Sequence, residues 1–150
     1  MERVGGADAL WAHTRLHVWP ERYVLLSFPT DRFVTASELV TACVGTFAAM
    51  LLERDEVSLT IPEAVWKASS GAVPARAEAG PFRAITFDLD IDLNVCGYLA
   101  PAAVRLAEAG VSIVPQCAYL KDHLLVHERD LPKAIEVLTG LISGKHEASA

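Results

Sequence analysis

Several features that mark common protein classes are scarce or missing in this sequence. Its three cysteines, Cys43, Cys96 and Cys117, are widely spaced and form no Cys-x-x-Cys pair, so neither a disulfide framework nor a zinc site is indicated. Acidic residues outnumber basic ones by 19 to 13, and the net charge of -6 gives no electrostatic footprint for nucleic acid. No apolar run approaches a membrane span and no secretory leader is evident, so we expect a soluble, cytoplasmic protein that binds no membrane.

Motifs of the common catalytic sites are missing as well. The sequence contains no Gly-rich phosphate loop, no Ser-His-Asp order and no nucleophile elbow. His123 and His127 are four residues apart in a predicted strand, where they would stand about 13 Å apart, too far for one metal ion. We therefore expect no catalytic residue, no metal and no cofactor, and we interpret the chain as a non-enzymatic protein.

The clearest positive pattern follows residue 80. Residues 85–95 alternate apolar and polar side chains, which predicts a strand with one face in a core. Gly97 permits a sharp turn into a helix over residues 100–109. A hairpin over residues 111–126 and a helix from Leu131 onward follow, so the order is strand, helix, strand, strand, helix.

The first half of the sequence shows a weaker version of the same order. Residues 15–28 predict two short strands, residues 35–44 a helix and residues 47–61 a hairpin. Residues 69–80 are rich in Ala, Gly, Ser and Pro and are the best candidate for a linker. The repeated order suggests two copies of one α+β unit.

The second half of the sequence resembles the ACT domain. The resemblance rests on Val95-Cys96-Gly97-Tyr98-Leu99-Ala100, on Leu106 to Ile113, and on Tyr119 with Asp122 to Val126. Weaker agreement in the first half covers Leu16 to Phe28, Asp55-Glu56-Val57-Ser58-Leu59 and Gly80-Pro81-Phe82. More narrowly, the chain looks like the small bacterial proteins with two tandem ACT-like modules, relatives of the Castor-type amino-acid sensors.

This resemblance implies an α+β fold of two tandem ferredoxin-like βαββαβ modules, the first one degenerate. The expected layout is a flexible N-terminal arm (1–14), a first module (15–68), a linker (69–80), a second module (81–144) and a tail (145–150). It also implies a regulatory, allosteric protein that forms a homodimer, binds an amino acid at an interface between modules and acts on a regulated partner protein.

The same resemblance implies a ligand site at the start of the helix after Gly97. Unpaired backbone N–H groups there would hold the ligand's carboxylate, and Asp122 would receive its ammonium or a basic side chain. The expected ligand-binding residues are Cys96, Gly97, Tyr98, Leu99, Ser112, Ile113 and Asp122. The chain departs from the family's pattern at Cys117, Ala118 and Leu120, where relatives commonly carry hydroxyl or other polar side chains.

Two alternatives stay open at this point. The segment from Ile85 to Asp90 is similar to the first motif of the haloacid-dehalogenase phosphatases, in which Asp88 would be the nucleophile and Asp90 the general acid/base of a magnesium-dependent enzyme. That match breaks at Ile91-Asp92, and a solvated strand face explains the aspartates more simply. The other alternative is a ligand-free assembly module, which the missing hydroxyls at Cys117 and Ala118 favour.

Overall fold

The chain folds into two compact units, and the sequence of one unit is inserted within the sequence of the other. The computed structural model describes residues 6–69 and 73–144, and the predicted tail of residues 145–150 lies outside the described residues. Trp19–Ala84 form one unit, which we call the inserted unit. Met1–Val18 and Ile85–Ala150 form the other, which we call the split unit. Within the described residues, no helix is long and apolar enough to cross a membrane.

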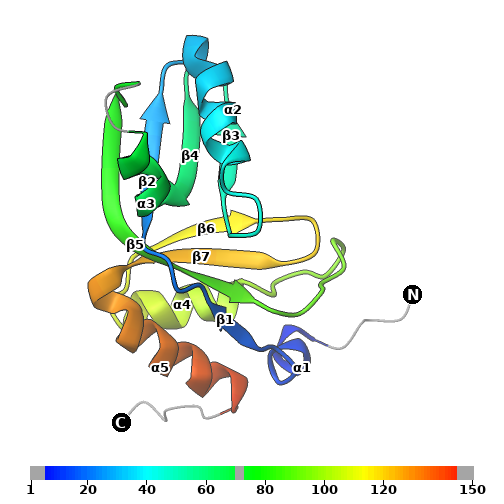
Figure 1. Ribbon diagram of the computed structural model, residues 1–150. Coiled ribbons are helices and arrows are strands. Elements are labelled where there is room, and N and C mark those ends of the chain that lie inside the picture. Colours follow the sequence, from blue (N-terminus) through cyan, green and yellow to red (C-terminus); the bar gives the residue numbers. More distant parts are fainter. Residues whose placement is uncertain (1–5, 70–72, 145–150) are drawn as a thin grey trace. The chain divides into compact units, whose positions relative to one another are not determined.

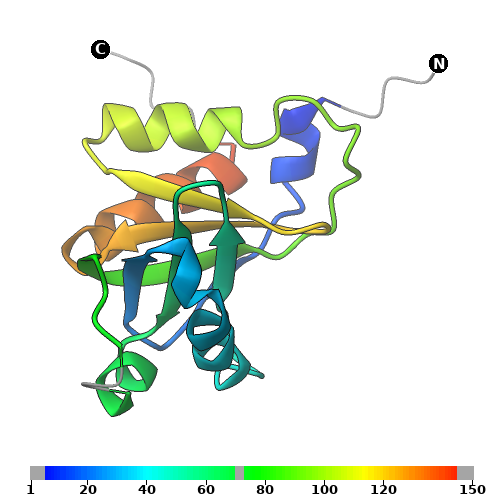
Figure 2. The same ribbon diagram turned by 90° about the horizontal axis from the view of Figure 1, so that it is seen from above.

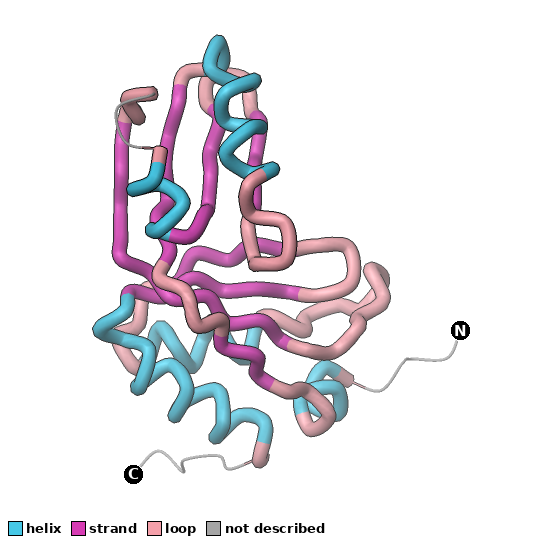
Figure 3. Tube along the Cα trace, in the orientation of Figure 1, coloured by secondary structure: helices cyan, strands magenta, loops and turns pink. Residues whose placement is uncertain are grey.

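The inserted unit is a complete βαββαβ module. Its elements are β2 (Tyr23–Phe28), η1 (Thr30–Arg32), α2 (Phe33–Thr41), β3 (Ala49–Leu52), β4 (Val57–Pro62), α3 (Glu63–Ala68) and the first part of β5 (Ala77–Phe87). Its antiparallel strands lie in the order β3-β4-β2-β5. Alternate residues of β2 and β4 pack with α2 and α3, which cover the same face of the strands (Figure 3).

The split unit has the same architecture with a different chain order. Its elements are α1 (Ala7–Trp11), β1 (Leu16–Val18), the last residues of β5, α4 (Ala100–Glu108), β6 (Ile113–Cys117), β7 (Asp122–His127), η2 (Glu128–Asp130) and α5 (Leu131–Ile142). The strands lie in the order β1-β5-β7-β6. In Figures 1 and 2, α4 and α5 cover one face of these strands, and their apolar sides join the core.

Strand β1 fills the position that the last strand of a βαββαβ module would take. Leu16, His17 and Val18 pair antiparallel with the end of β5. The predicted module boundaries therefore differ from the structure, because this strand was expected to open the first module at residue 15. The predicted linker over residues 69–80 differs too, because residues 77–80 belong to β5, while residues 70–72 lie outside the described part.

The N-terminal segment is not a loose arm from residue 7 onward, which corrects the prediction for residues 1–14. Trp11 ends α1 and is 1% exposed. Its indole stacks on Tyr98 with ring centroids 4.8 Å apart and meets Phe87 edge-on at 4.9 Å. A five-residue helix is too short to show a helical period, so periodicity does not predict this packing, and only the apolar Leu10 and Trp11 indicated that the segment could dock. Residues 1–5 lie outside the described part.

Strand β5 ends at Phe87, so the strand predicted over residues 85–95 is wrong beyond that point. The Asp92 carboxylate accepts a hydrogen bond from the Asn94 backbone N–H at 2.8 Å, which is turn chemistry that competes with a strand ladder. Ile91 and Val95 nevertheless pack against the core of the split unit. The alternation of apolar and polar residues after Phe87 therefore arises from a loop whose apolar side chains are partly buried, and not from a continuing strand.

Candidate functional site

The loop of residues 88–99, between β5 and α4, meets the turn of the β6–β7 hairpin at one edge of the split unit. The backbone N–H of Ile91 donates a hydrogen bond to the Leu120 carbonyl at 2.9 Å. The hydroxyl of Thr86 and Nδ1 of His123 are 2.7 Å apart, which places the start of β7 beside the end of β5. The Asp122 carboxylate acts electrostatically on the Tyr98 side chain, so the end of the loop before α4 also lies at the edge that carries the hairpin turn.

Gly97 forms the exposed turn that leads into α4. Its φ of +81° lies in the left-handed region that favours glycine, and a Cβ added there would meet no atom within 4 Å. Helix α4 begins after Leu99 without a side-chain cap, and its early Pro101 lacks an N–H. The Ala103 N–H donates to the Leu99 carbonyl at 3.0 Å, and Ala102 is buried. Ala100 is the exposed residue of the first turn, so its N–H is the one that can face an anionic partner, and the helix dipole favours negative charge there.

Asp122 and Cys117 face each other across the β6–β7 hairpin as cross-strand partners. Cys117 is exposed as a residue, but partial desolvation of its thiol and then the hydrogen bond to the Asp122 carboxylate raise the pKa of Cys117 to about 11. The thiol is therefore protonated at neutral pH and donates to that carboxylate. Members of the ACT family commonly carry a hydroxyl side chain at the position of Cys117. A thiol in place of that hydroxyl still provides a hydrogen-bond donor beside Asp122.

Tyr98 supports this edge from inside the core rather than lining a binding surface. Its phenol is 4% exposed, and its hydroxyl lies 2.6 Å from the Thr14 hydroxyl. Its carbonyl accepts a hydrogen bond from the Trp11 indole at 2.8 Å. Burial is the main reason that the pKa of Tyr98 is raised, and the nearby Asp122 carboxylate raises it further. The side chain predicted to line the site thus anchors the backbone next to Gly97.

Ser112 and Ile113 lie at the other end of the same hairpin. Ile113 pairs with Val126, four residue pairs along the ladder from Cys117 and Asp122. That separation is about 13 Å along the strands. The split unit therefore brings the Gly97 turn and Asp122 to one edge but leaves Ser112 and Ile113 at the opposite one.

We call the first edge the Gly97 site, made of Cys96, Gly97, the first turn of α4, Cys117 and Asp122. Cys96 and Gly97 are exposed, and Leu99 is half-buried against the core. The sequence patterns did not reveal the supporting roles of Trp11 and Thr14, since both lie more than 80 residues from Tyr98 in the chain.

Asp88 and Asp90 form an ion pair with a lysine instead of a metal site. The Nζ of Lys121 is 3.7 Å from Oδ1 of Asp88 and 2.5 Å from Oδ1 of Asp90. Both carboxylates are more than half exposed. Among the residues that the structure describes, no group of three or more His, Cys, Asp or Glu side chains could hold a metal ion. The arrangement is typical of a surface ion pair.

Comparison with known proteins agrees with this architecture. Residues 79–140 match a family model described as an ACT domain. No curated protein sequence matches the chain. A solved structure of a protein of unknown function from Vibrio cholerae, described as a possible transport protein, is similar with a TM-score of 0.68 and 17% identity over 90% of this chain and 94% of its own.

Two further solved structures share the fold. A protein from Agrobacterium tumefaciens has a TM-score of 0.64 and 21% identity over 86% of this chain and 89% of its own. The regulatory subunit of aspartate kinase from Thermus flavus has a TM-score of 0.60 and 8% identity over 85% of this chain and 95% of its own. With the strand order of both units, these likenesses confirm the predicted fold class: an α+β chain of two ferredoxin-like modules of the ACT type.

Proposed function

We propose that this protein is a non-enzymatic regulatory protein that binds a free amino acid at the Gly97 site. One observation carries the proposal: the Gly97 turn places the uncapped start of α4 at the same edge of the split unit as the Asp122 carboxylate. An amino acid offers a carboxylate for the helix start and an ammonium for Asp122. The two ends of the ligand thus meet partners of opposite charge.

The ACT-domain match of residues 79–140 supports a regulatory role, as does the shared fold with a subunit that is itself named regulatory. We further propose a cytoplasmic homodimer of the tandem ACT type related to the Castor sensors, with the ligand at an interface between modules. A free amino acid is too short to span the distance to Ser112 and Ile113. Those residues would therefore contact the ligand only from a second protomer.

The mechanism of such a sensor is linkage. A ligand that bridges two modules binds the assembled state better than the open one and shifts its population, with a coupling of about 1–3 kcal/mol. Because the proposed role includes no catalysis, the signal would pass to a regulated partner protein.

The proposal is tested by thermal unfolding of the full chain with each free amino acid at millimolar concentration. A ligand present at about 100 times its Kd stabilises by about 2.7 kcal/mol, which raises Tm by roughly 5–10 °C for a chain of this length. We expect at least one amino acid to do so. A flat panel, with dimerisation unaffected by any amino acid, would contradict the proposal and favour the ligand-free assembly module.

Two variants locate the binding site. Gly97→Val should abolish the stabilisation, because the added side chain blocks the approach to the start of α4. Gly110→Val is the matched control: Gly110 has φ +75° and equally open surroundings, at the other end of the same helix. Asp122→Asn should weaken binding about tenfold or more, since it removes a charge-assisted hydrogen bond. Unchanged affinity in both site variants would exclude this location.

The phosphatase alternative has its own discriminating assay. Turnover of a generic phosphate ester with magnesium, lost on Asp88→Asn, would overturn the non-enzymatic proposal. We expect no turnover in either protein, because Lys121 occupies the position between the two carboxylates where a metal ion would have to bind.

A further inference from the structure

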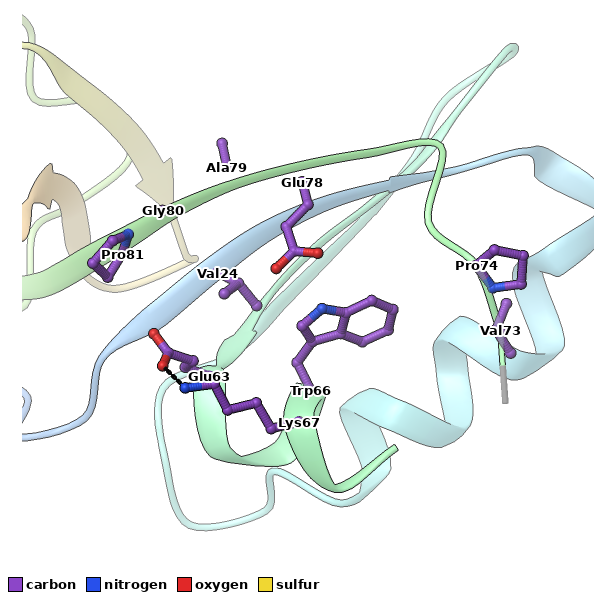
Figure 4. A pocket seen from close by; sticks show the side chains of 10 residues that line it. All are labelled: Val24, Glu63, Trp66, Lys67, Val73, Pro74, Glu78, Ala79, Gly80 and Pro81. Carbon is purple, nitrogen blue, oxygen red and sulfur yellow. Dashed lines mark hydrogen bonds and ion pairs between the residues drawn. The ribbon is translucent and has the colours of Figure 1, made fainter. Parts of the chain in front are cut away.

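A separate cavity of about 690 Å³ lies wholly within the inserted unit and shares no residue with the Gly97 site. Figure 4 shows that its walls come from β2, from α3, from the segment before β5 and from β5 itself. A volume of this size is in the range of small-molecule sites in proteins, which are mostly apolar with a few placed polar groups. The question is which ligand its side chains would recognise.

A β-bulge forms one wall of the cavity. The pairing of β2 with β5 shifts register between Tyr23–Phe82 and Leu25–Ala79, so two residues of β5 stand opposite Val24 alone. Gly80 is one of the two, with φ +147°, and a Cβ there would lie 2.9 Å from the Tyr23 carbonyl oxygen. Bulges of this kind redirect side chains and are frequent beside binding sites.

Glu78 brings a negative charge onto the helix-facing side of the strands. It pairs with Leu26, and cross-strand partners point to the same face. Leu26 is 1% exposed on that face, beneath the helices. Within the described part of the chain, the Glu78 side chain has neither a hydrogen bond nor an ion pair. In Figure 4 its carboxylate points toward Trp66 and Val24.

Trp66 supplies an aromatic surface next to this carboxylate. Its indole packs edge-on against Phe28 with ring centroids 5.9 Å apart, which fixes its orientation. A cation over an indole face is attracted by the ring's quadrupole, and a carboxylate beside it adds a charge-assisted hydrogen bond. Trp66 and Glu78 thus favour the same sign of ligand charge.

The other charged residues of the wall are already paired. Lys67 donates a hydrogen bond to Glu63, and the Nε of Arg22 lies 3.8 Å from the same carboxylate. The hydrogen bond from Lys67 is the main cause that lowers the pKa of Glu63. Glu63 is therefore ionised and compensated at neutral pH, whereas the Glu78 carboxylate has no cationic partner among the described residues. An anionic ligand would meet Glu78 unfavourably, so the wall selects for a cation.

We propose that the inserted unit binds a small organic cation, an alkylammonium or a guanidinium, with its charged head between the Trp66 indole and the Glu78 carboxylate. The aliphatic part of the ligand lies against Val24 and Pro81, which supply apolar wall. This site is additional to the proposed amino-acid site. Glu78 has a competing explanation, because an inward-facing charge on an outer strand also discourages edge-to-edge pairing of sheets. If Glu78 has that role alone, no ligand binds in the cavity.

The test is a titration of the full chain with butylammonium and butylguanidinium at constant ionic strength, followed through the indole N–H signal of Trp66 by NMR. Trp66→Phe assigns that signal. We expect both cations to shift it saturably, while neutral butanol and anionic butyrate leave it unmoved. Failure of both cations to shift the signal, or an equal response to butanol, would overturn the proposal.

Glu78→Gln is the decisive variant, because the exposed side chain can change without loss of the fold. It should weaken butylammonium binding about tenfold or more, since the charge-assisted hydrogen bond is lost. Glu38→Gln is the matched control, an exposed carboxylate on α2 of the same unit outside the cavity. Equal affinity of the Glu78→Gln protein and the wild type would refute the assignment.

Discussion

Replacing Trp11 by alanine tests whether the N-terminal segment is part of the split unit's core. The indole is 1% exposed, stacks on Tyr98, meets Phe87 edge-on and donates a hydrogen bond to the Tyr98 carbonyl. These contacts tie α1 to the core of the split unit, as pairing with β5 ties β1 to the sheet. If residues 7–14 were detached from the core, Trp11→Ala would remove few contacts and would hardly change the free energy of unfolding.

The magnitude follows from the buried area. A buried tryptophan covers about 150–250 Å², which at about 25 cal/mol per Å² corresponds to roughly 4–6 kcal/mol. Measured Trp→Ala substitutions in cores cost about 3–5 kcal/mol, in agreement. Trp11→Phe keeps most of the ring but leaves the buried Tyr98 carbonyl without its donor, at a cost of about 1–3 kcal/mol. Either loss is large against a typical total of about 5–15 kcal/mol.

The assay is urea unfolding of the full chain, followed by circular dichroism and by tryptophan fluorescence. In the Trp11 variants the remaining tryptophans, Trp19 and Trp66, belong to the inserted unit, so fluorescence then reports that unit alone. Val44→Ala is the control, because Val44 is 88% exposed and should change stability by less than about 0.5 kcal/mol. A Trp11→Ala protein within about 0.5 kcal/mol of wild type would refute the packing argument.

Two further predictions concern a glycine and a thiol. Gly80→Ala should lower the free energy of unfolding by about 1–3 kcal/mol more than Gly45→Ala, because both need positive φ but only Gly80 faces a carbonyl oxygen, at 2.9 Å. Equal losses in urea melts would contradict this. Cys117 has a raised pKa of about 11, so its stabilising protonation is intact below pH 9 and is lost as the pH rises toward 11. Mass spectrometry should find slow alkylation by iodoacetamide at pH 8, with faster reaction beginning at lower pH in Asp122→Asn; an identical pH profile in that variant would exclude the carboxylate as a cause.

Local patterns predicted the elements that local interactions determine. The helices from Ala100 and Leu131 have apolar residues at helical spacing, and both were expected close to where they lie. The hairpins were expected for similar reasons, from alternation between turn residues. The strand beyond Phe87 was mispredicted, because a loop whose apolar residues dock on a core can show the same alternation as a strand.

Long-range pairing is what the sequence could not reveal. Nothing in Leu16 to Val18 distinguishes a strand that pairs with its neighbour from one that pairs with residues 85–87. The same holds for the candidate site. The resemblance pointed to Gly97 and Asp122, but only the structure shows that Tyr98 faces the core and that Cys117 donates to Asp122. The cavity of the inserted unit depends on a register shift at Gly80 and Pro81. That pair indicates a bulge only once residues 77–87 are known to form a strand, and the sequence predicted a linker there.

The placement of β1 has a consequence for how the protein is made on the ribosome. Synthesis proceeds from the N-terminus, and domains generally fold as they emerge. All the strands of the inserted unit are available once residue 84 has left the exit tunnel, whereas Leu16–Val18 have no partner strand until residues 85–87 follow. Strand β1 is therefore translated before the inserted unit but belongs to the unit that is completed after it. Until then its exposed edge is open to pairing with other nascent chains.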